Sequence, residues 1–339
     1  MTFPHTTPAA VHLAALVAAM GACLCLPAPA FGLDSSTVTT LTVEQARELM
    51  AKKLQSTGGL DGGFGSLDAL TILDPEVAEV LVESPGAISF NGLTELSPAT
   101  AAVLARHKPV SGFGAADLRL NGLKTIAPEA AEALAAHEGK VLLYGLERLD
   151  SVPLAQKLAR QWGELRLGLT ELSPEIAAEL AKHRGNEEDK TRPGVTHRRA
   201  DGAASVLRLD MITTLSPETA EALAAHEGVL VLNGLVSLDP PVAAALAKRV
   251  GNRKNNRVGT LVLNGLPAIS PEAAGALAVF PGELVLKGIT DLSPEAAAAL
   301  ATHKGRLHLT GLTTLSHETR ATLQGHPSVL LPRPPVAAP

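Results

Sequence analysis

Histidine recurs at a corresponding place near the end of predicted helices, where its chemistry could serve two purposes. The recurring residues are His107, His137, His183, His226, His303 and His326. Neutral imidazole ligates metal ions, so a ladder of histidines could hold metal. A histidine at a helix C-terminus can instead contact the carbonyl ends and favour the helix dipole. Ser84, Arg249 and Phe280 interrupt the row, and no carboxylate accompanies it at a fixed spacing. We therefore favour the structural interpretation.

Glutamate also recurs once per unit, directly after a proline that begins a predicted helix. These residues are Glu76, Glu129, Glu175, Glu218, Glu272 and Glu295. A carboxylate in the first helical turn favours the dipole, whereas acid–base catalysis needs carboxylates at unique positions in a cleft. The sequence contains no zinc-protease helix, phosphate-binding loop or nucleophile elbow. It predicts no catalytic residue, no metal and no cofactor, so an enzyme is the least favoured interpretation.

A third set of residues would point outward from one face of the predicted strands. Its partner-binding candidates are Arg119, Arg166, Arg208, Val231, Val262 and Val285. With Val206 and Val229 alongside, the later valines predict an exposed apolar patch, and such patches mark contact sites. Valine also simply suits strands, and both interpretations stay open. Arginines beside an apolar patch are typical of interfaces.

These residues are positioned by a repeat. Each unit is anchored on one residue, usually glycine, and six of the nine gaps between anchors are 23 residues, the others being 30, 43 and 31. The anchors are Ala69, Gly92, Gly122, Gly145, Gly168, Met211, Gly234, Gly265, Gly288 and Gly311. A fixed period in the range of roughly 20–50 residues is the signature of stacked-repeat proteins.

Each unit has two halves with different hydrophobic periods. Leu118 and Leu120 alternate with polar residues, which predicts a short half-buried strand, and Gly122 then allows a backbone turn. Ser270 is a good N-cap, and Pro271 suits the first helical position. Glycines near the predicted helix ends favour left-handed caps; they are Gly139, Gly185, Gly228, Gly251, Gly282 and Gly305.

Neither half is stable by itself. A helix of about ten residues is marginal alone in water, so successive units must bury their leucines against one another. The sequence thus predicts an α/β solenoid, with a parallel sheet of short strands on one face and short helices on the other.

The recurring motif resembles the leucine-rich-repeat family. It is most similar to a bacterial variant whose units read Leu-x-Leu-x-Gly-Leu-x-x-Leu-Ser-Pro-Glu-x-Ala-x-x-Leu-Ala-x-His-x-Gly, over roughly residues 36–331. The residue before the anchor glycine is asparagine only at 91, 121, 233 and 264, so a continuous asparagine ladder is not expected. The resemblance implies a binding or scaffolding role.

The N-terminal segment resembles a secretory signal. Residues 9–26 are apolar and are followed by Ala28-x-Ala30, which predicts a signal peptide over 1–30. The leader lacks Lys and Arg, so an uncleaved membrane anchor or a lipid attached at Cys23 remains an alternative. Both cysteines, Cys23 and Cys25, lie in this segment, and a mature chain would have none.

The remaining boundaries follow the repeat. Residues 31–63 comprise a degenerate capping unit, with capping-box spacing at Thr42 and Gln45, and a glycine-rich link. Ten repeat units span 64–331, and a proline-rich tail spans 332–339. Insertions at 109–116, 186–204 and 252–258 are either solvated loops or a rim for a partner. One extra helical residue at Leu158 and one missing strand residue before Gly168 predict a local kink.

Composition limits the classes of partner. The net charge is −5 at 46% apolar content, which does not indicate attraction to nucleic acid or to an anionic membrane surface. We expect a secreted, periplasmic or surface-exposed scaffold, without a membrane span in the mature chain, that binds a protein or an envelope macromolecule through its strand face. The alternative is a passive structural protein of the cell envelope.

Overall fold

The computed structural model describes residues 38–56, 67–84, 86–108, 117–185, 205–249 and 259–332. The chain divides into two compact units, residues 1–33 and 34–339, and every described residue belongs to the second. The predicted signal segment, the glycine-rich link at 58–65, the three insertions and nearly all of the tail lie outside the described residues. No helix among the described residues is long and apolar enough to cross a membrane.

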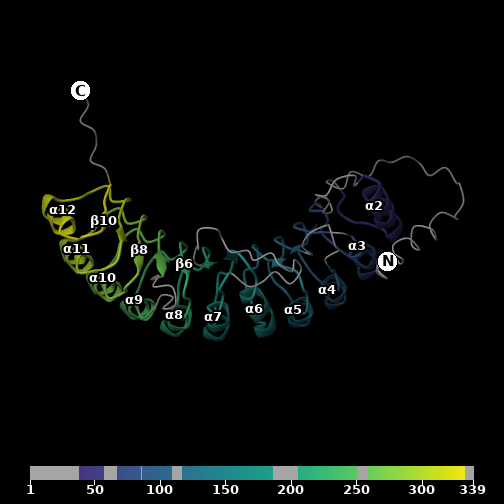
Figure 1. The fold of residues 1–339 in the computed structure, drawn as a ribbon, viewed down its shortest axis with the longest axis horizontal. Coiled ribbons are helices and arrows are strands. Elements are labelled where there is room, and N and C mark those ends of the chain that lie inside the picture. Colours follow the sequence, from purple (N-terminus) through teal and green to yellow (C-terminus); the bar gives the residue numbers. More distant parts are fainter. Residues whose placement is uncertain are drawn as a thin grey trace, which may run out of the picture. The chain divides into compact units, whose positions relative to one another are not determined.

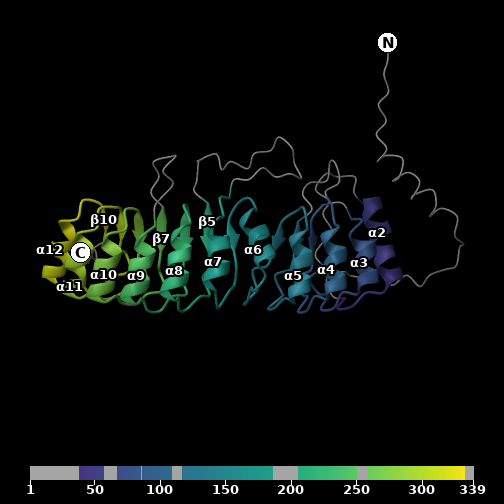
Figure 2. The ribbon, with the colours of Figure 1, turned by 90° about the horizontal axis from the view of Figure 1, so that it is seen from below.

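Residues 34–339 form an α/β structure in which short helices and short parallel strands alternate. Its eleven described helices are α2 (Val43–Ser56), α3 (Pro75–Leu81), α4 (Pro98–Ala105), α5 (Pro128–Ala135), α6 (Val152–Ala159), α7 (Pro174–Leu180), α8 (Pro217–Ala224), α9 (Pro240–Ala247), α10 (Pro271–Ala278), α11 (Pro294–Ala301) and α12 (His317–Gln324). Consecutive helices lie side by side in one layer, and the strands form the opposite layer (Figures 1 and 2).

The strands pair with the strands of neighbouring units in two parallel sheets. They are β1 (Ile88–Ser89), β2 (Leu118–Arg119), β3 (Val141–Leu142), β4 (Leu165–Arg166), β5 (Val206–Arg208), β6 (Val229–Val231), β7 (Thr260–Val262), β8 (Glu283–Val285), β9 (Leu307–His308) and β10 (Val329–Leu330). One sheet has the order β1-β2-β3, and the other runs without a gap from β4 to β10. The interruption between β3 and β4 coincides with the slip predicted from Leu158 and Gly168.

The helix beginnings follow the sequence prediction. The Ser270 hydroxyl accepts a hydrogen bond from the Ala273 backbone at 3.1 Å, and Pro271 is the first residue of α10. The Thr42–Gln45 capping box is also present: the Thr42 amide donates to Gln45 Oε1 at 2.8 Å, and the Gln45 amide donates to Thr42 Oγ1 at 3.3 Å. These bonds satisfy amide groups that have no partner within the helix.

The predicted left-handed conformation is wrong at Gly139, Gly228, Gly282 and Gly305 and is confirmed at Gly185, while Gly251 lies outside the described residues. Among the described glycines only Gly86, Gly163 and Gly185 have a positive φ, and the helices end on right-handed residues. Close stacking explains the other glycines instead. A Cβ on Gly305 would lie 1.9 Å from the carbonyl oxygen of Gly282 in the preceding unit.

The anchor glycines also lie so close to a carbonyl oxygen of the preceding unit that a side chain would not fit. A Cβ on Gly265 would lie 1.9 Å from the Asn233 carbonyl oxygen, and one on Gly122 would lie 2.1 Å from that of Asn91. Neither glycine has a positive φ, so the absence of a side chain matters here more than conformational freedom. The stack is therefore tight enough that glycine is required once per regular unit.

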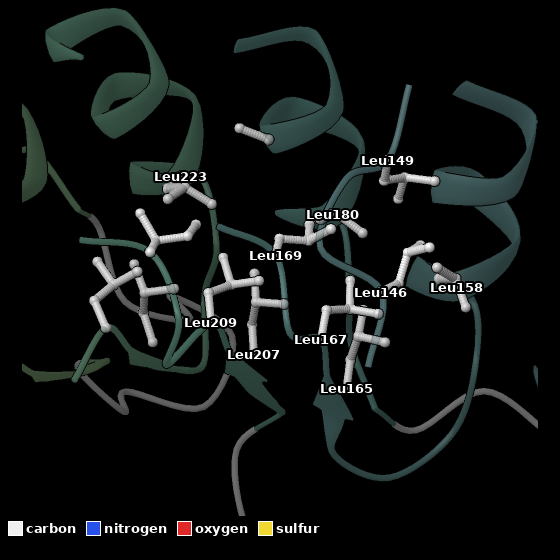
Figure 3. Packing of buried hydrophobic residues seen from close by; sticks show 14 of the residues in the cluster. Leu146, Leu149, Leu158, Leu165, Leu167, Leu169, Leu180, Leu207, Leu209 and Leu223 are labelled. Atoms are coloured by element: carbon white, nitrogen blue, oxygen red, sulfur yellow. The ribbon is translucent and has the colours of Figure 1, made fainter. Parts of the chain in front are cut away.

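The core lies between the two layers. Leucines of the strand half, such as Leu207 and Leu209, pack against Leu169 and Leu180 of the preceding unit and Leu223 of the same unit (Figure 3). All five are buried. Each unit thus covers the apolar side chains of its neighbour, which no single unit can do for itself.

Candidate binding face

The outward-pointing row predicted from the sequence lies in register across the larger sheet. Parallel pairing places the following residues on adjacent strands, in this order: Arg166, Arg208, Val231, Val262, Val285 and His308. Arg119 occupies the equivalent place in the smaller sheet, between Ser89 and Leu142. Adjacent strands lie about 4.7–4.9 Å apart, so the side chains of one row touch their neighbours.

The expected exposed valine patch is wrong for two of its three central members. Val231 is only 3% exposed and Val285 is 8% exposed, while Val262 is half-buried. Each valine is flanked on both sides by a row neighbour, and branched side chains at this spacing cover one another. The valines therefore favour the strand-propensity interpretation more than an open apolar contact surface.

The arginine end of the row is more accessible. Arg119 and Arg166 are exposed, whereas Arg208 is half-buried and held by two carboxylates. Its Nε donates to Glu164 Oε1 at 2.6 Å, and its Nη1 donates to Asp210 Oδ2 at 3.3 Å. The hydrogen bond that Arg208 donates to Glu164, more than any other contact, raises the pKa of Arg208. Arg208 is thus charge-compensated, and Arg166 lies beside it in the row.

A shallow hollow of about 170 Å³ lies next to Arg166, where the two sheets separate. Tyr144 and Met211 line it and are 40% and 56% exposed. The Arg166 guanidinium carbon lies 5.8 Å from the centre of the Tyr144 ring, within the range of a cation–π contact. The sequence does not single out Tyr144 and marks Met211 only as an anchor residue, because neither position shows from its own unit that it borders a hollow.

The polar ladder beside the strands stops at the same place. The Asn121 amide donates to Asn91 Oδ1 at 3.1 Å, and the Tyr144 amide donates to Asn121 Oδ1 at 3.0 Å. The series is present again where the Asn264 amide donates to Asn233 Oδ1 at 3.1 Å. Between these segments Asp210 Oδ1 is buried without a hydrogen-bond partner. The ladder is discontinuous, as the varied residues before the anchors predict.

The recurring histidines form a buried column that contacts the preceding helix of the stack. His183 Nδ1 lies 3.0 Å from the carbonyl oxygen of Ala159, the last residue of α6, and Nε2 lies 2.9 Å from that of Gly163. His303 Nδ1 similarly lies 3.3 Å from the carbonyl oxygen of Ala278 at the end of α10. These contacts support the structural interpretation, in which the imidazoles meet carbonyls at helix C-termini.

Burial and charge both act on this column. Burial lowers the pKa of His183 and His303, and burial with the nearby Arg249 lowers the pKa of His226 to about 3. Arg249 takes the histidine's place in its own unit and donates to the carbonyl oxygens of His226 and Gly228 at 3.1 and 2.7 Å. Among the described residues, no three His, Cys, Asp or Glu side chains are grouped so as to hold a metal ion.

Comparisons with known proteins add no relative. No protein-family model matches the chain, and no curated protein matches it in sequence.

Proposed function

We propose that this chain is a leucine-rich-repeat-like solenoid that binds another macromolecule through its strand face and carries out no catalysis. The in-register row that ends in Arg166 and Arg208 is the observation that carries this proposal. A row of side chains repeated at about 4.7–4.9 Å offers an extended contact surface of the kind that stacked-repeat proteins use. The resemblance of the repeat motif to that family supports the same role.

The binding surface is centred on the arginine end rather than on the valines. Arg119, Arg166 and Tyr144 are exposed, whereas Val231 and Val285 are buried. Arginine, tyrosine and methionine are enriched at protein interfaces, and binding energy concentrates on a few such residues. The preferred partner is therefore a protein, and the valines contribute mainly to the stability of the sheet.

The location that fits this role is outside the cytoplasm or in the cell envelope. Support for it comes from the sequence alone, since residues 9–26 are apolar and Ala28 and Ala30 form a small-residue cleavage pattern. Sequencing the N-terminus of the protein isolated from its source cells tests this part. A chain beginning at Phe31 supports export with cleavage, and a cytoplasmic chain beginning at Met1 contradicts it.

The binding face is tested by capturing partners from the source cells with the full chain and with two variants. Arg119→Glu combined with Arg166→Glu reverses charge at two exposed strand-face positions. Arg160→Glu makes the same change at the exposed C-cap of α6, on the helix side. We expect the strand-face variant to lose the captured protein and the Arg160 variant to retain it, with unchanged circular dichroism for both. Retention by both folded variants would show that the partner binds elsewhere.

A further inference from the structure

The hollow beside Arg166 results from one missing residue in an otherwise regular stack. In β2 and the residues after it, Leu120 is followed by Asn121 and then by the anchor Gly122, whereas Leu167 is followed directly by Gly168. Gly168 remains in the stack, because a Cβ there would lie 2.4 Å from the Tyr144 carbonyl oxygen. The ladder position that should lie between Tyr144 and Asp210 is thus vacant, which leaves a hollow across three units.

Met211 is explained by the same vacancy. It occupies an anchor position that is glycine in the following unit, where a Cβ on Gly234 would lie 2.3 Å from the Asp210 carbonyl oxygen. A full side chain fits at Met211 because the unit before it is one residue short. It is 56% exposed at the edge of the hollow and offers a flexible apolar contact.

The cations around the hollow differ in whether a carboxylate pairs with them, and Arg208 pairs with both Glu164 and Asp210. Lys124 pairs with Glu147 at 3.0 Å, and Asp210 pairs with Arg208 at 3.3 Å. In the described part of the chain, no carboxylate pairs with Arg166, which lies over the Tyr144 ring. The contact with the Tyr144 ring restrains the guanidinium only weakly, since both side chains are exposed. The hollow therefore presents a planar, positively charged donor beside an aromatic ring.

We propose that this hollow binds the carboxylate of an aspartate or glutamate side chain of a protein partner. A guanidinium matches a carboxylate through two parallel hydrogen bonds, which an ammonium cannot reproduce. Tyr144 and Met211 flank the carbon atoms of the acidic side chain. This inference rests on the proposed function, since it names the group by which the partner is anchored on the strand face.

The test uses N-acetyl-glutamate amide, a single glutamate side chain on a neutral backbone, titrated into the full chain. The Nε–Hε signal of Arg166 is followed by nitrogen-15 NMR and is identified by its loss in Arg166→Gln. We expect a saturable shift of this signal. The Arg119 signal is the internal control, because Arg119 is also exposed but does not line the hollow.

Three comparisons make the result specific. N-acetyl-glutamine amide, which lacks the charge, should give no saturable shift. Tyr144→Ala should weaken glutamate binding by roughly two- to fivefold, since the guanidinium loses its contact with the ring, whereas Tyr144→Phe should bind as the parent does. Arg166→Lys, followed through the Met211 methyl signal, should weaken binding by a similar factor.

Two results would overturn the inference. Equal shifts at Arg119 and Arg166 would mean general attraction of an anion, and tighter binding of galacturonate or inorganic phosphate would replace the protein side chain with a different ligand. The proposed function fails separately. If glutamate leaves Arg166 unshifted while the Arg119→Glu, Arg166→Glu variant still loses its partner, the strand face binds by other contacts and only the hollow is excluded.

Discussion

The units around β4 and the units from β6 to β8 share one motif but differ in how completely their backbones stack. In the β6–β8 region every anchor is glycine, the row valines cover one another, and the ladder passes from Asn233 through Asn264 to Lys287. Around β4 the ladder stops, the sheet is interrupted, and Met211 replaces glycine. The omission of a single residue therefore turns a closed surface into one with accessible side chains.

This difference bears on two requirements of a stack of repeats, which are stability and access for a ligand. Regular units are stable because each backbone fits closely against the one before it, and this fit leaves little room for a ligand. An irregular unit loses some of these contacts and leaves a hollow beside exposed groups such as Tyr144 and Arg166. We infer that the regular region supplies rigidity and that the interruption supplies recognition.

The largest expected effect comes from adding one methyl group to the regular region. Gly265→Ala would place a Cβ 1.9 Å from the Asn233 carbonyl oxygen, so backbones on both sides must shift. We expect the free energy of unfolding to fall by roughly 1–3 kcal/mol or more, measured by urea unfolding. Met211→Ala is the matched change at an irregular anchor and should alter it by about 0.5 kcal/mol or less. Equal losses would mean that the two regions stack equally closely.

A second effect concerns the buried column, which passes through both regions. The pKa of His226 is lowered to about 3, so the unfolded chain binds a proton there at a higher pH than the folded chain does. The free energy of unfolding therefore falls as the pH decreases from about 6.5 toward 3, and this residue accounts for a loss on the order of 2 kcal/mol at pH 5. Urea unfolding at pH 7.5 and pH 5 measures this loss.

The matched variants assign this pH dependence to the column. Gln161 takes the place of the histidine at the end of α6: it is buried, and its amide donates to the Leu158 carbonyl as that of His226 does to Leu223. His226→Gln introduces the same residue and should remove most of the His226 contribution. His317→Gln changes an exposed histidine at the start of α12, outside the column, and serves as the control, which should retain the loss assigned to His226. If the His226 variant loses as much stability at pH 5 as the parent chain does, another group is responsible.

Much of this architecture could be predicted because the repeat fixes local choices. Spacing between anchors places Arg166, Arg208 and Val231 in one row, since parallel strands of equal units must pair in register. The Ser270 cap and the Thr42–Gln45 box follow from residue type and position alone. The slip at Leu158 and Gly168 located the interruption of the sheet, because a count of residues is sufficient to detect it.

Properties that depend on the neighbouring unit could not be predicted in this way. The burial of Val231 and Val285 depends on what flanks them across the sheet, and alternation along one strand does not show this. The helix-end glycines were assigned a left-handed conformation, but Gly282 and Gly305 are required by a carbonyl of the preceding unit. The hollow at Tyr144 is lined by residues of three successive units, so the sequence of a single unit does not reveal it.

The smallest effect on stability should come from inserting the residue that is missing between Leu167 and Gly168. This change also tests most directly whether the missing residue accounts for the difference between the two regions. An asparagine inserted between Leu167 and Gly168 fills the vacant ladder position, and its side-chain oxygen offers the Asp210 amide an acceptor. Tyr144 has no side-chain carbonyl to receive the amide of the inserted residue, so the gain is limited to about one hydrogen bond. The free energy of unfolding should therefore rise by about 1 kcal/mol at most.

The accessible groups should respond far more than stability does. Because the new residue occupies the hollow, the Arg166 signal should no longer shift with N-acetyl-glutamate amide, and the Asp210 amide should exchange its hydrogen more slowly. An asparagine inserted after the exposed Lys304, which does not line the hollow, adds the same length elsewhere in the stack and serves as the control. If glutamate still shifts Arg166 when the ladder position is filled, the missing residue is not what creates the binding site, and the regular and interrupted regions differ in stacking alone.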